Sequence, residues 1–515
     1  KTDAVRRRQK EGNMQYQNPV IRGFHPDPSI CRVGEDYYLV TSSFEYFPGI
    51  PVFHSRDLVN WKQIGNCVQD AEAFPLLEAK DSGGVWAPTI RYEEGLFYVT
   101  ATLSMYGNFI VTASDPAGEW SAPVWVEAGG IDPSLYFENG HAFYCTNQSL
   151  HPGREEITLE EIDVRSGKRI GEQHSVWAGI GGGFLEAPHI YRIGERYYLF
   201  AAEGGTNFNH MITAAGSASL FGPYESCPDN PILTNVHDTS KEVQCAGHGD
   251  LFQDHRGNWW LVHLGIRLSR RTMSHLGRET FLTPVVWENG WPKVENNRRA
   301  ALCCDGPLWE PQRDVPAWKA DFTKKEWEPE WIFLRKPEMA SYERGDGVLR
   351  LHPSRITFRD GKNPTFAAVR QRDFDCVTEA ELSFSPKQPG DEAGIAALLS
   401  SEFHYRFGKK RTEEGDMLIL EKCAEDFRQT AFCMPIPAGR LRLRMEAEKE
   451  AFHFFYAAED GPFVKACSAS TRFLACEVAG RCFTGTVVGL YAFSDADTKA
   501  VMEVSAFSMG PKEEG

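Results

Sequence analysis

The sequence lacks long apolar runs, an excess of positive charge and cysteine pairs at metal-ligand spacing. Without an apolar run of about 20 residues, we expect no membrane-spanning helix and no membrane partner. The formal net charge of −16 argues against nucleic acid as a partner, because phosphate binding needs a basic surface. A chain of 515 residues with this charge is typical of a protein of two or more domains that binds a neutral ligand or an uncharged polymer.

The cysteine pattern predicts free thiols. The chain has 13 cysteines, an odd number without a Cys-x-x-Cys pair, and the adjacent Cys303 and Cys304 do not form a metal-site spacing. We therefore expect a reducing compartment and a cytoplasmic location. Residues 1–13 are charged and lack the apolar core of a signal peptide, so we interpret them as an N-terminal extension or as residues added for expression, with Met14 as the expected native start. Secretion stays open.

Long helical periodicity is also scarce, and one strand–turn–strand pattern recurs instead. Its first copy runs from Asp27-Pro-Ser-Ile30 through Gly34 to Tyr37-Tyr-Leu-Val40. A glycine turn between two aromatic or β-branched stretches predicts a β-hairpin. Four further copies begin at Ala87, Asp132, Ala187 and Gly249. The copies start roughly 45 to 62 residues apart, which is the spacing of propeller blades, so residues 14–311 are predicted to form a five-bladed β-propeller.

The repeat also predicts where chemistry is concentrated. Equivalent strands of all blades line the central channel of a propeller, so equivalent repeat positions converge there. Those positions are Asp27, Trp86-Ala87, Asp132, Glu186-Ala187 and His248-Gly249. Carboxyl groups gathered in this way raise one another's pKa, and hydrolysis of a glycosidic bond needs one carboxylic acid and one carboxylate. An aspartate before a proline is otherwise a common turn device, and convergence alone favours the catalytic interpretation of Asp27.

A second domain follows a proline-rich break. Residues 305–316 interrupt the repeat, and we expect the linker at 312–317. Four alternating stretches beyond it predict strands of a β-sandwich spanning residues 318–515: 347–352, 378–384, 441–445 and 487–493. The predicted fold class is thus all-β.

Three other residues have both a structural and a functional interpretation. Trp86 is either a core filler at a blade end or a platform for the apolar face of a sugar. His248, flanked by glycines, is either a satisfied structural histidine or a group that binds a metal or a water in the channel. Arg278 is either a surface or salt-bridged arginine or a fork that binds sugar hydroxyls and keeps a carboxylate ionised.

At these residues the sequence resembles glycoside hydrolase family 43, in its branch of β-xylosidases and α-L-arabinofuranosidases with an additional carboxy-terminal domain. The resemblance begins at about Met14, covers nearly the whole chain and rests on the motifs Asn18–Arg32, Ser43–Ile50, Asp81–Pro88, Phe184–His189, Ala202–Thr206 and Leu276–Phe281. It implies a five-bladed propeller, a concanavalin-like β-sandwich and hydrolysis with inversion. It further implies that Asp27 is the general base, that Glu186 is the general acid and that Asp132 orients and tunes that acid.

The resemblance also implies the walls of the innermost sugar subsite. Arg278, Phe44 and Trp86 match positions that line it, and Phe483 matches a residue by which a sandwich loop closes the site. His248 matches a histidine that reaches a calcium ion through waters in many members.

Two departures from the family pattern lie beside catalytic positions. His25 stands where many xylosidases of the branch have asparagine, and the residues before the acid in Gly181–Glu186 also differ. His25 is a further candidate substrate-binding residue, and both departures leave the sugar preference open.

We therefore expect an exo-acting inverting hydrolase that releases terminal pentoses from xylo- and arabinoxylo-oligosaccharides, as a β-D-xylosidase, an α-L-arabinofuranosidase or both. The alternatives are a non-catalytic carbohydrate-binding propeller and an exo-arabinanase-type enzyme. No cofactor is expected for the chemistry itself, with Ca²⁺ in the channel as an open question. Whether the chain forms homo-oligomers is also open.

Overall fold

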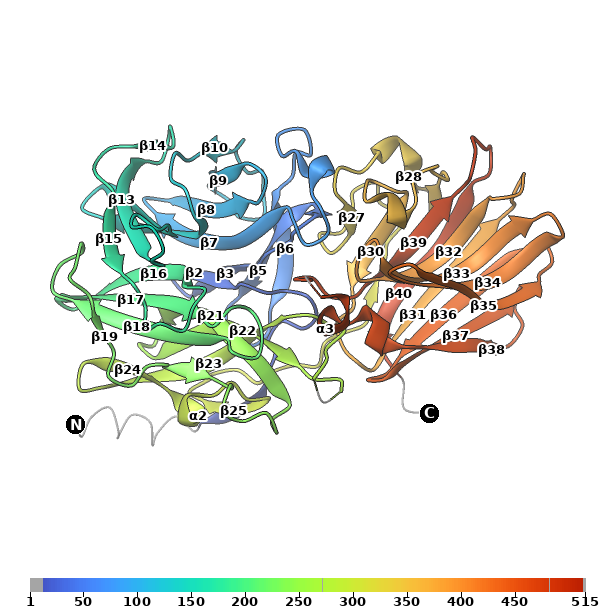
Figure 1. The fold of residues 1–515 in the computed structure, drawn as a ribbon. Helices are drawn as coiled ribbons and strands as arrows, with labels where there is room; N and C mark the ends of the chain where they lie inside the picture. The colour runs from blue at the N-terminus through green and yellow to red at the C-terminus, as the bar shows by residue number, and fades with distance from the viewer. Residues whose placement is uncertain (1–12, 271, 481, 513–515) are drawn as a thin grey trace.

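The computed structural model describes residues 13–270, 272–480 and 482–512. Two β-domains lie side by side, a ring of small sheets and a pair of larger curved sheets (Figure 1). This arrangement confirms the prediction of a five-bladed propeller followed by a β-sandwich. The helices of the described part, α2 (Glu295–Arg298) and α3 (Cys476–Ala479), have four residues each, and none there is long and apolar enough to cross a membrane.

Each blade is one antiparallel sheet that begins at the channel. The innermost strands contact one another around the ring. They are β2 (Ser29–Val33), β7 (Val85–Glu93), β11 (Ile131–Glu138), β16 (Glu186–Ile193) and β21 (Val243–Gln253). The second strands are β3 (Asp36–Val40), β8 (Leu96–Leu103), β12 (His141–Asn147), β17 (Arg196–Glu203) and β22 (Trp259–Arg267). Each repeat copy is thus one innermost hairpin, as its glycine turn predicts.

The outer strands complete the blades, and a strand pair joins the two ends of the domain. The third strands are β5 (Gly49–Ser55), β9 (Gly107–Ala113), β13 (Ile157–Asp163), β18 (Met211–Ser217) and β23 (Glu279–Glu288). The outermost are β6 (Lys62–Val68), β10 (Val124–Trp125), β14 (Lys168–Arg169) with β15 (His174–Trp177), β19 (Glu225–Ser226) with β20 (Leu233–Thr234), and β24 (Trp291–Val294). β1 (Met14–Gln17) pairs antiparallel with β25 (Cys303–Gly306) and so ties the start of the domain to its end.

The five repeat positions share one unusual backbone conformation. Their φ angles are positive, at 57° for Asp27, 40° for Ala87, 51° for Asp132, 52° for Ala187 and 48° for His248. L-residues rarely adopt this left-handed region, and such strain concentrates at functional sites. In four of the blades the pairing of the innermost hairpin shifts register at this point. The first blade has the left-handed residue without such a shift, because Asp27 precedes β2.

A second polar layer lies two residues further along each innermost strand. Residues two apart in a strand point to the same side, so this layer follows directly from the first. It consists of the buried side chains of Ser29, Thr89, Ser134, His189 and Asp250. The Arg91 guanidinium donates to Asp250 at 2.9 Å and contacts the His189 ring at 2.9 Å. The channel is therefore filled by a hydrogen-bonded network at this depth.

The second domain consists of two eight-stranded sheets around one apolar core. The first contains β28 (Tyr342–Gly345), β29 (Val348–Leu351), β40 (Met502–Pro511), β31 (Cys376–Phe384), β36 (Arg440–Ala447), β37 (Ala451–Ala458) and β38 (Val464–Ser470), with β26 (Trp318–Lys319) on β40. The second contains β35 (Phe427–Pro435), β34 (Gly415–Ala424), β33 (Phe403–Thr412), β32 (Glu392–Leu398), β39 (Val487–Phe493), β30 (Phe366–Arg370), β27 (Ile332–Leu334) and β4 (Tyr46–Phe47). All four alternating stretches of the sequence lie on these strands. The predicted linker lies between β25 and β26.

The two domains share a sheet, which the sequence did not indicate. β4 comes from the propeller part of the chain yet pairs antiparallel with β27 at the edge of the sandwich. Arg335, only 1% exposed, reinforces this junction by donating to the Ala79 carbonyl at 2.6 Å and to Asp81 at 2.7 Å. The sandwich is therefore held firmly against the propeller, and its loops can contribute to a site at the channel end.

Candidate active site

Three carboxyl groups from three blades meet at the channel end, as the repeat predicts. Asp27 is 4% exposed and accepts hydrogen bonds from the Ser42 hydroxyl at 2.5 Å and from Arg278 at 2.9 Å. Burial raises the pKa of Asp27, but Arg278, His248 and the Ser42 hydrogen bond outweigh it and leave the pKa below 3.8. Asp27 is therefore a carboxylate at neutral pH.

The other two carboxyl groups are shifted in the opposite direction. Burial and the negative charge of Asp27 raise the pKa of Glu186 from 4.5 to about 7. Burial, followed by the charges of Glu186 and Asp27, raises the pKa of Asp132 well above its usual value. Groups in one cluster whose environments drive their pKa values apart are the pattern of an acid–base pair. Here Asp27 has the lowered pKa, and Glu186 and Asp132 have the raised ones.

The segment before Glu186 is held by two further carboxylates. Glu155 accepts hydrogen bonds from the backbone N–H groups of Phe184 and Leu185, at 3.0 and 3.3 Å. Glu203 accepts from the N–H groups of Ile180 and Gly182, at 2.9 and 2.7 Å. These four hydrogen bonds hold the backbone of the glycine-rich segment 180–185 in place. They leave the Phe184 ring 66% exposed beside the acid.

Arg278 connects the base to the second domain. Its Nη1 donates to Asp27 and, at 2.9 Å, to the Thr206 hydroxyl, while Nη2 donates to the Phe483 carbonyl at 3.2 Å. The guanidinium also lies 5.8 Å from the centre of the Phe44 ring. A planar fork of donors suits both a carboxylate and the hydroxyl groups of a sugar. Arg278 is thus an interior residue of the site, which excludes the surface-arginine interpretation.

An aromatic wall stands beside the carboxyl groups. The Phe483 ring stacks on Phe44 with centroids 6.1 Å apart and meets the Trp86 ring edge-on at 6.3 Å. Trp86 is partly exposed and donates from its indole to the Ser82 carbonyl at 3.0 Å. Phe483 belongs to the segment after α3, which reaches from the sandwich to the propeller in Figure 1. Both domains therefore build the site.

His25 lies in the first blade, two residues before Asp27. Its ring is buried, packs edge-on against Phe53 at 4.9 Å and lies 3.3 Å from the Thr41 hydroxyl. Burial and the charges of Arg370 and Arg372 lower its pKa well below the ordinary value. The backbone of His25 does support the site, because its N–H donates to the Arg278 carbonyl at 3.1 Å. A direct contact of its ring with sugar stays a prediction.

His248 lies at the channel end with a second imidazole nearby. Its Nδ1 is 3.6 Å from Asp27, and burial lowers its pKa. His210 contacts the Cys245 carbonyl through Nδ1 at 3.2 Å, so that nitrogen carries the proton. Its buried Nε2 then holds a lone pair and has no hydrogen-bond partner. Within residues 13–270, 272–480 and 482–512, no group of three or more His, Cys, Asp or Glu side chains could hold a metal ion. This donor set fits only a cation ligated mostly by water.

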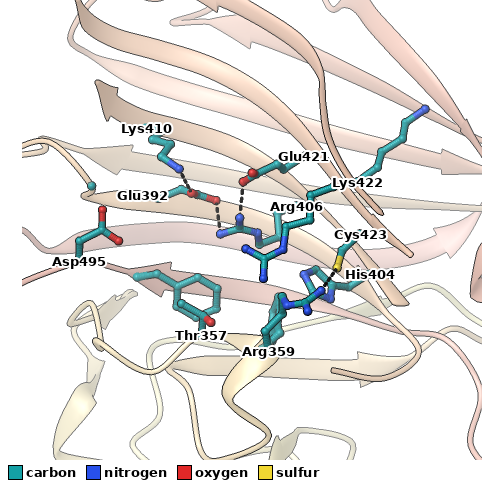
Figure 2. Close-up of a pocket in the computed structure, with 14 residues that line it drawn as sticks. Thr357, Arg359, Glu392, His404, Arg406, Lys410, Glu421, Lys422, Cys423 and Asp495 are labelled. Atoms are coloured by element: carbon teal, nitrogen blue, oxygen red, sulfur yellow. Dashed lines mark hydrogen bonds and ion pairs between the residues drawn. The ribbon is translucent and has the colours of Figure 1, made fainter. Parts of the chain in front are cut away.

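A separate polar cavity of about 220 Å³ lies on the sandwich (Figure 2). The Arg406 guanidinium lies there between Glu392, at 2.8 Å, and Glu421, and Lys410 approaches Glu392 to 3.2 Å. These charges are paired with one another, and none of the predicted site residues lines the cavity. We therefore interpret it as a structural ion-pair network of the sandwich.

Several residues of the site escaped the sequence analysis. Ser42, Thr206 and Glu155 lie outside the aligned repeat positions, in segments that connect strands. No local pattern distinguishes them from ordinary loop residues. The second polar layer was readable in principle, because the third residue is polar in four of the five repeat copies. These are Asp27-Pro-Ser29, Ala87-Pro-Thr89, Asp132-Pro-Ser134 and Ala187-Pro-His189.

A five-bladed propeller that gathers one carboxyl group of lowered pKa and two of raised pKa at its channel end is typical of a class, the carboxylate-dependent glycoside hydrolases. The comparisons specify the family. Residues 16–292 match the model of glycosyl hydrolases family 43, and residues 319–509 match the beta xylosidase C-terminal Concanavalin A-like domain. The chain belongs to glycoside hydrolase family 43 and is an enzyme of that class.

Relatives of known name resemble it over nearly their full length. A non-reducing end alpha-L-arabinofuranosidase of Bacteroides ovatus is 39% identical over 494 residues, which cover 93% of this chain and 91% of that protein. A xylosidase/arabinosidase of Butyrivibrio fibrisolvens is 34% identical over 507 residues, covering 93% of this chain and 96% of that one. The solved structure of the Bacteroides ovatus xyloglucan PUL GH43B protein has a TM-score of 0.92 at 36% identity and covers 97% of this chain and 100% of its own.

Proposed function

We propose that this enzyme removes terminal pentose residues from xylo- and arabinoxylo-oligosaccharides, as a β-D-xylosidase, an α-L-arabinofuranosidase or both. The observation that carries the chemistry is the opposite direction of the pKa shifts of Asp27 and Glu186 in one cluster. The two activities named for the relatives support the sugar class.

The proposed reaction is a single displacement. The Glu186 carboxylic acid gives its proton to the glycosidic oxygen as the bond to the anomeric carbon breaks. The Asp27 carboxylate takes a proton from a water that attacks that carbon from the opposite face, so the product has the inverted configuration. Asp132 accepts a hydrogen bond from the Ala187 N–H, directly after Glu186, and its position supports a role in orienting the acid. The Arg278 fork keeps Asp27 ionised and offers donors to sugar hydroxyls.

The second domain supports exo action. Phe483 lies across Phe44 and Trp86 and is tied to the propeller by its N–H, which donates to the Ser82 hydroxyl at 2.9 Å. A wall from a separate domain on this side of the carboxyl groups leaves room for a chain end and obstructs a continuing polymer. Terminal units and side branches are therefore the expected substrates.

We further propose that His248, with His210 beside it, holds a hydrated Ca²⁺ through waters. Such an ion supplies positive charge near Asp27 and would help keep that carboxylate ionised. Addition of Ca²⁺ after treatment with a chelator should raise the melting temperature of the wild-type protein and leave that of a His248→Ala variant unchanged. An equal response of both proteins would remove this part of the proposal.

The decisive experiment is kcat/KM on an aryl β-D-xylopyranoside and an aryl α-L-arabinofuranoside, side by side. A large ratio in either direction identifies a single-specificity enzyme, and comparable values identify a dual one. Proton NMR of the first product tests the stereochemistry, because an inverting enzyme releases α-xylose from a β-xyloside. Activity on neither glycoside, or release of β-xylose, would overturn the proposal.

The thiols support a reducing compartment as the place of action. All 13 cysteines are free, and most of them are buried. We propose a cytoplasmic location, with imported oligosaccharides as the supply. Fractionation of the source cells, followed by detection with an antibody, tests this.

A further inference from the structure

Two cysteines lie in contact within the segment that carries Phe483. Cys476 begins α3 and Cys482 directly precedes Phe483, and their sulfur atoms are 3.1 Å apart. A disulfide bond is about 2.05 Å long, so an approach of roughly 1 Å would form one. Both residues are of intermediate solvent exposure.

The two thiols have different environments. Cys476 donates toward the Cys482 sulfur, and its own sulfur lies 2.8 Å from the Thr484 carbonyl. The hydrogen bonds from Cys476, Thr484 and Ser82 lower the pKa of Cys482, while the bond to Cys482 and burial raise that of Cys476. The thiolate is the attacking species in disulfide exchange, so Cys482 is the nucleophile and Cys476 the resolving thiol.

The position of this pair connects it to substrate binding. The residue after Cys482 forms the aromatic wall with Phe44 and Trp86, and its carbonyl accepts a hydrogen bond from Arg278. A bond at Cys482 restrains the adjacent backbone. Such a bond therefore also restrains Phe483. Among the contacts described above, Phe483 is the one wall residue that comes from the sandwich.

We propose that Cys476 and Cys482 form a reversible disulfide with a small-molecule disulfide as oxidant, and that this bond tightens substrate binding by holding Phe483 in the wall. The effect on binding rests on the proposed function, whereas the bond itself does not. In a reducing compartment such a pair responds to oxidation transiently.

The reaction proceeds by two exchanges. The Cys482 thiolate attacks one sulfur of the external disulfide, which releases one thiolate and leaves a mixed disulfide on Cys482. Cys476 loses its proton and attacks the Cys482 sulfur, which forms the Cys476–Cys482 bond and releases the second thiolate. The protein loses two hydrogen atoms and two electrons in total, and the reagent is reduced to two thiols.

The experiment compares the full-length protein after treatment with oxidised glutathione and with dithiothreitol. Free thiols are alkylated under denaturing conditions, and peptides are mapped by mass spectrometry. The variants are Cys476→Ser and Cys482→Ser, and Cys433→Ser on β35 is the matched control because that thiol is exposed and lies on a different strand. We expect a Cys476–Cys482 link in the wild type and the control that dithiothreitol reverses.

The kinetic arm measures KM and kcat for the better of the two aryl glycosides. Because the bond reduces the freedom that the loop loses on binding, we expect oxidation to lower KM about threefold with kcat little changed, and only in proteins with both cysteines. A different cysteine pairing, or no link, overturns the modification site. A link that leaves KM unchanged or raises it, or the same change in Cys476→Ser, overturns the effect on binding. Peptide mapping needs no activity, so a failure of the proposed function stays distinguishable from a failure of this inference.

Discussion

Replacement of Glu186, the proposed general acid, should stabilise the protein at high pH while it lowers the activity. The change is Glu186→Gln, which keeps the size of the side chain and removes its ionisation. The folded protein holds Glu186 in a buried cluster beside the Asp27 carboxylate, where a second negative charge is unfavourable. The amide never acquires that charge, so the variant avoids its cost.

The magnitude follows from the pKa shift. Folding raises the pKa of Glu186 from 4.5 to about 7. Between these values the unfolded chain has lost the proton that the folded protein still holds, so the free energy of unfolding of the wild type falls as pH rises. Below pH 4.5 the group contributes nothing, and above about pH 7 the loss is complete. At about 1.36 kcal/mol per pKa unit, the full loss is about 3 kcal/mol.

The assay is denaturant unfolding of wild type and variant at about pH 5 and about pH 8, followed by fluorescence of the tryptophans. We expect nearly equal stabilities at the lower pH and a variant more stable by about 3 kcal/mol at the higher pH. Loss of the general acid should lower kcat by about 10²- to 10⁴-fold on substrates with poor leaving groups. Glu195→Gln, at an exposed turn of the same blade, is the control that should show neither effect.

A stability difference that is the same at both pH values would refute the reasoning, because it would mean that packing rather than ionisation separates the two proteins. A variant less stable than wild type at about pH 8 would show that the Glu186 carboxylate is favourably bound in the fold. Either result would also remove the electrostatic basis for its role as the acid.

Three other changes test the remaining parts of the site. In the wild type, kcat/KM should fall as pH rises through about 7, the pKa of Glu186, which gives the pH profile its basic limb. Glu155→Gln should move this basic limb to lower pH, because it removes a negative charge that raises the pKa of Glu186. Ser42→Ala should raise the pKa of Asp27, move the acidic limb to higher pH and lower kcat/KM about tenfold, because it deletes the 2.5 Å hydrogen bond to that carboxylate. Phe184→Ala should raise KM for xylo-oligosaccharides more than for an aryl glycoside with the same terminal sugar, because the exposed ring beside the acid can contact the departing sugar. An unchanged basic limb in Glu155→Gln would contradict the first expectation, and an unchanged acidic limb in Ser42→Ala would contradict the second. Equal increases in KM for both substrates in Phe184→Ala would contradict the third.

The repeat predicted the innermost part of the site because a repeat fixes register. Asp27, Asp132, Glu186 and His248 were placed together from five similar hairpins. The left-handed φ recurs at Asp27, Asp132 and His248 and at Ala187, the residue directly after Glu186, so the blades share one local backbone conformation at the channel end. The sandwich strands were predictable for a similar reason, since alternation along a strand records which face is buried.

What the sequence did not predict depends on contacts between distant segments. β4 has only the two residues Tyr46 and Phe47 before a proline, too short for an alternating pattern, and it becomes a strand because β27 offers a free edge. Phe483 entered the analysis through family resemblance alone, since nothing in a sandwich loop indicates which part of the propeller it meets. The contact between Cys476 and Cys482 likewise appears only once the chain turns after α3.

The two layers at the channel have opposite energetic roles. In the outer layer, burial and mutual repulsion raise the pKa values of Glu186 and Asp132. Ionisation of these two groups therefore lowers the free energy of unfolding as pH rises. In the layer beneath, Arg91 and hydrogen bonds hold the pKa of Asp250 far below its usual value, so that carboxylate favours the fold at neutral pH. Because both layers follow one another along the same five segments, the hydrogen bonds of Arg91 with Asp250 and His189 below support the backbone that the strained residues above require. A substitution in the lower layer should therefore disturb activity through geometry, although none of its side chains contacts the three catalytic carboxyl groups in the interactions described here.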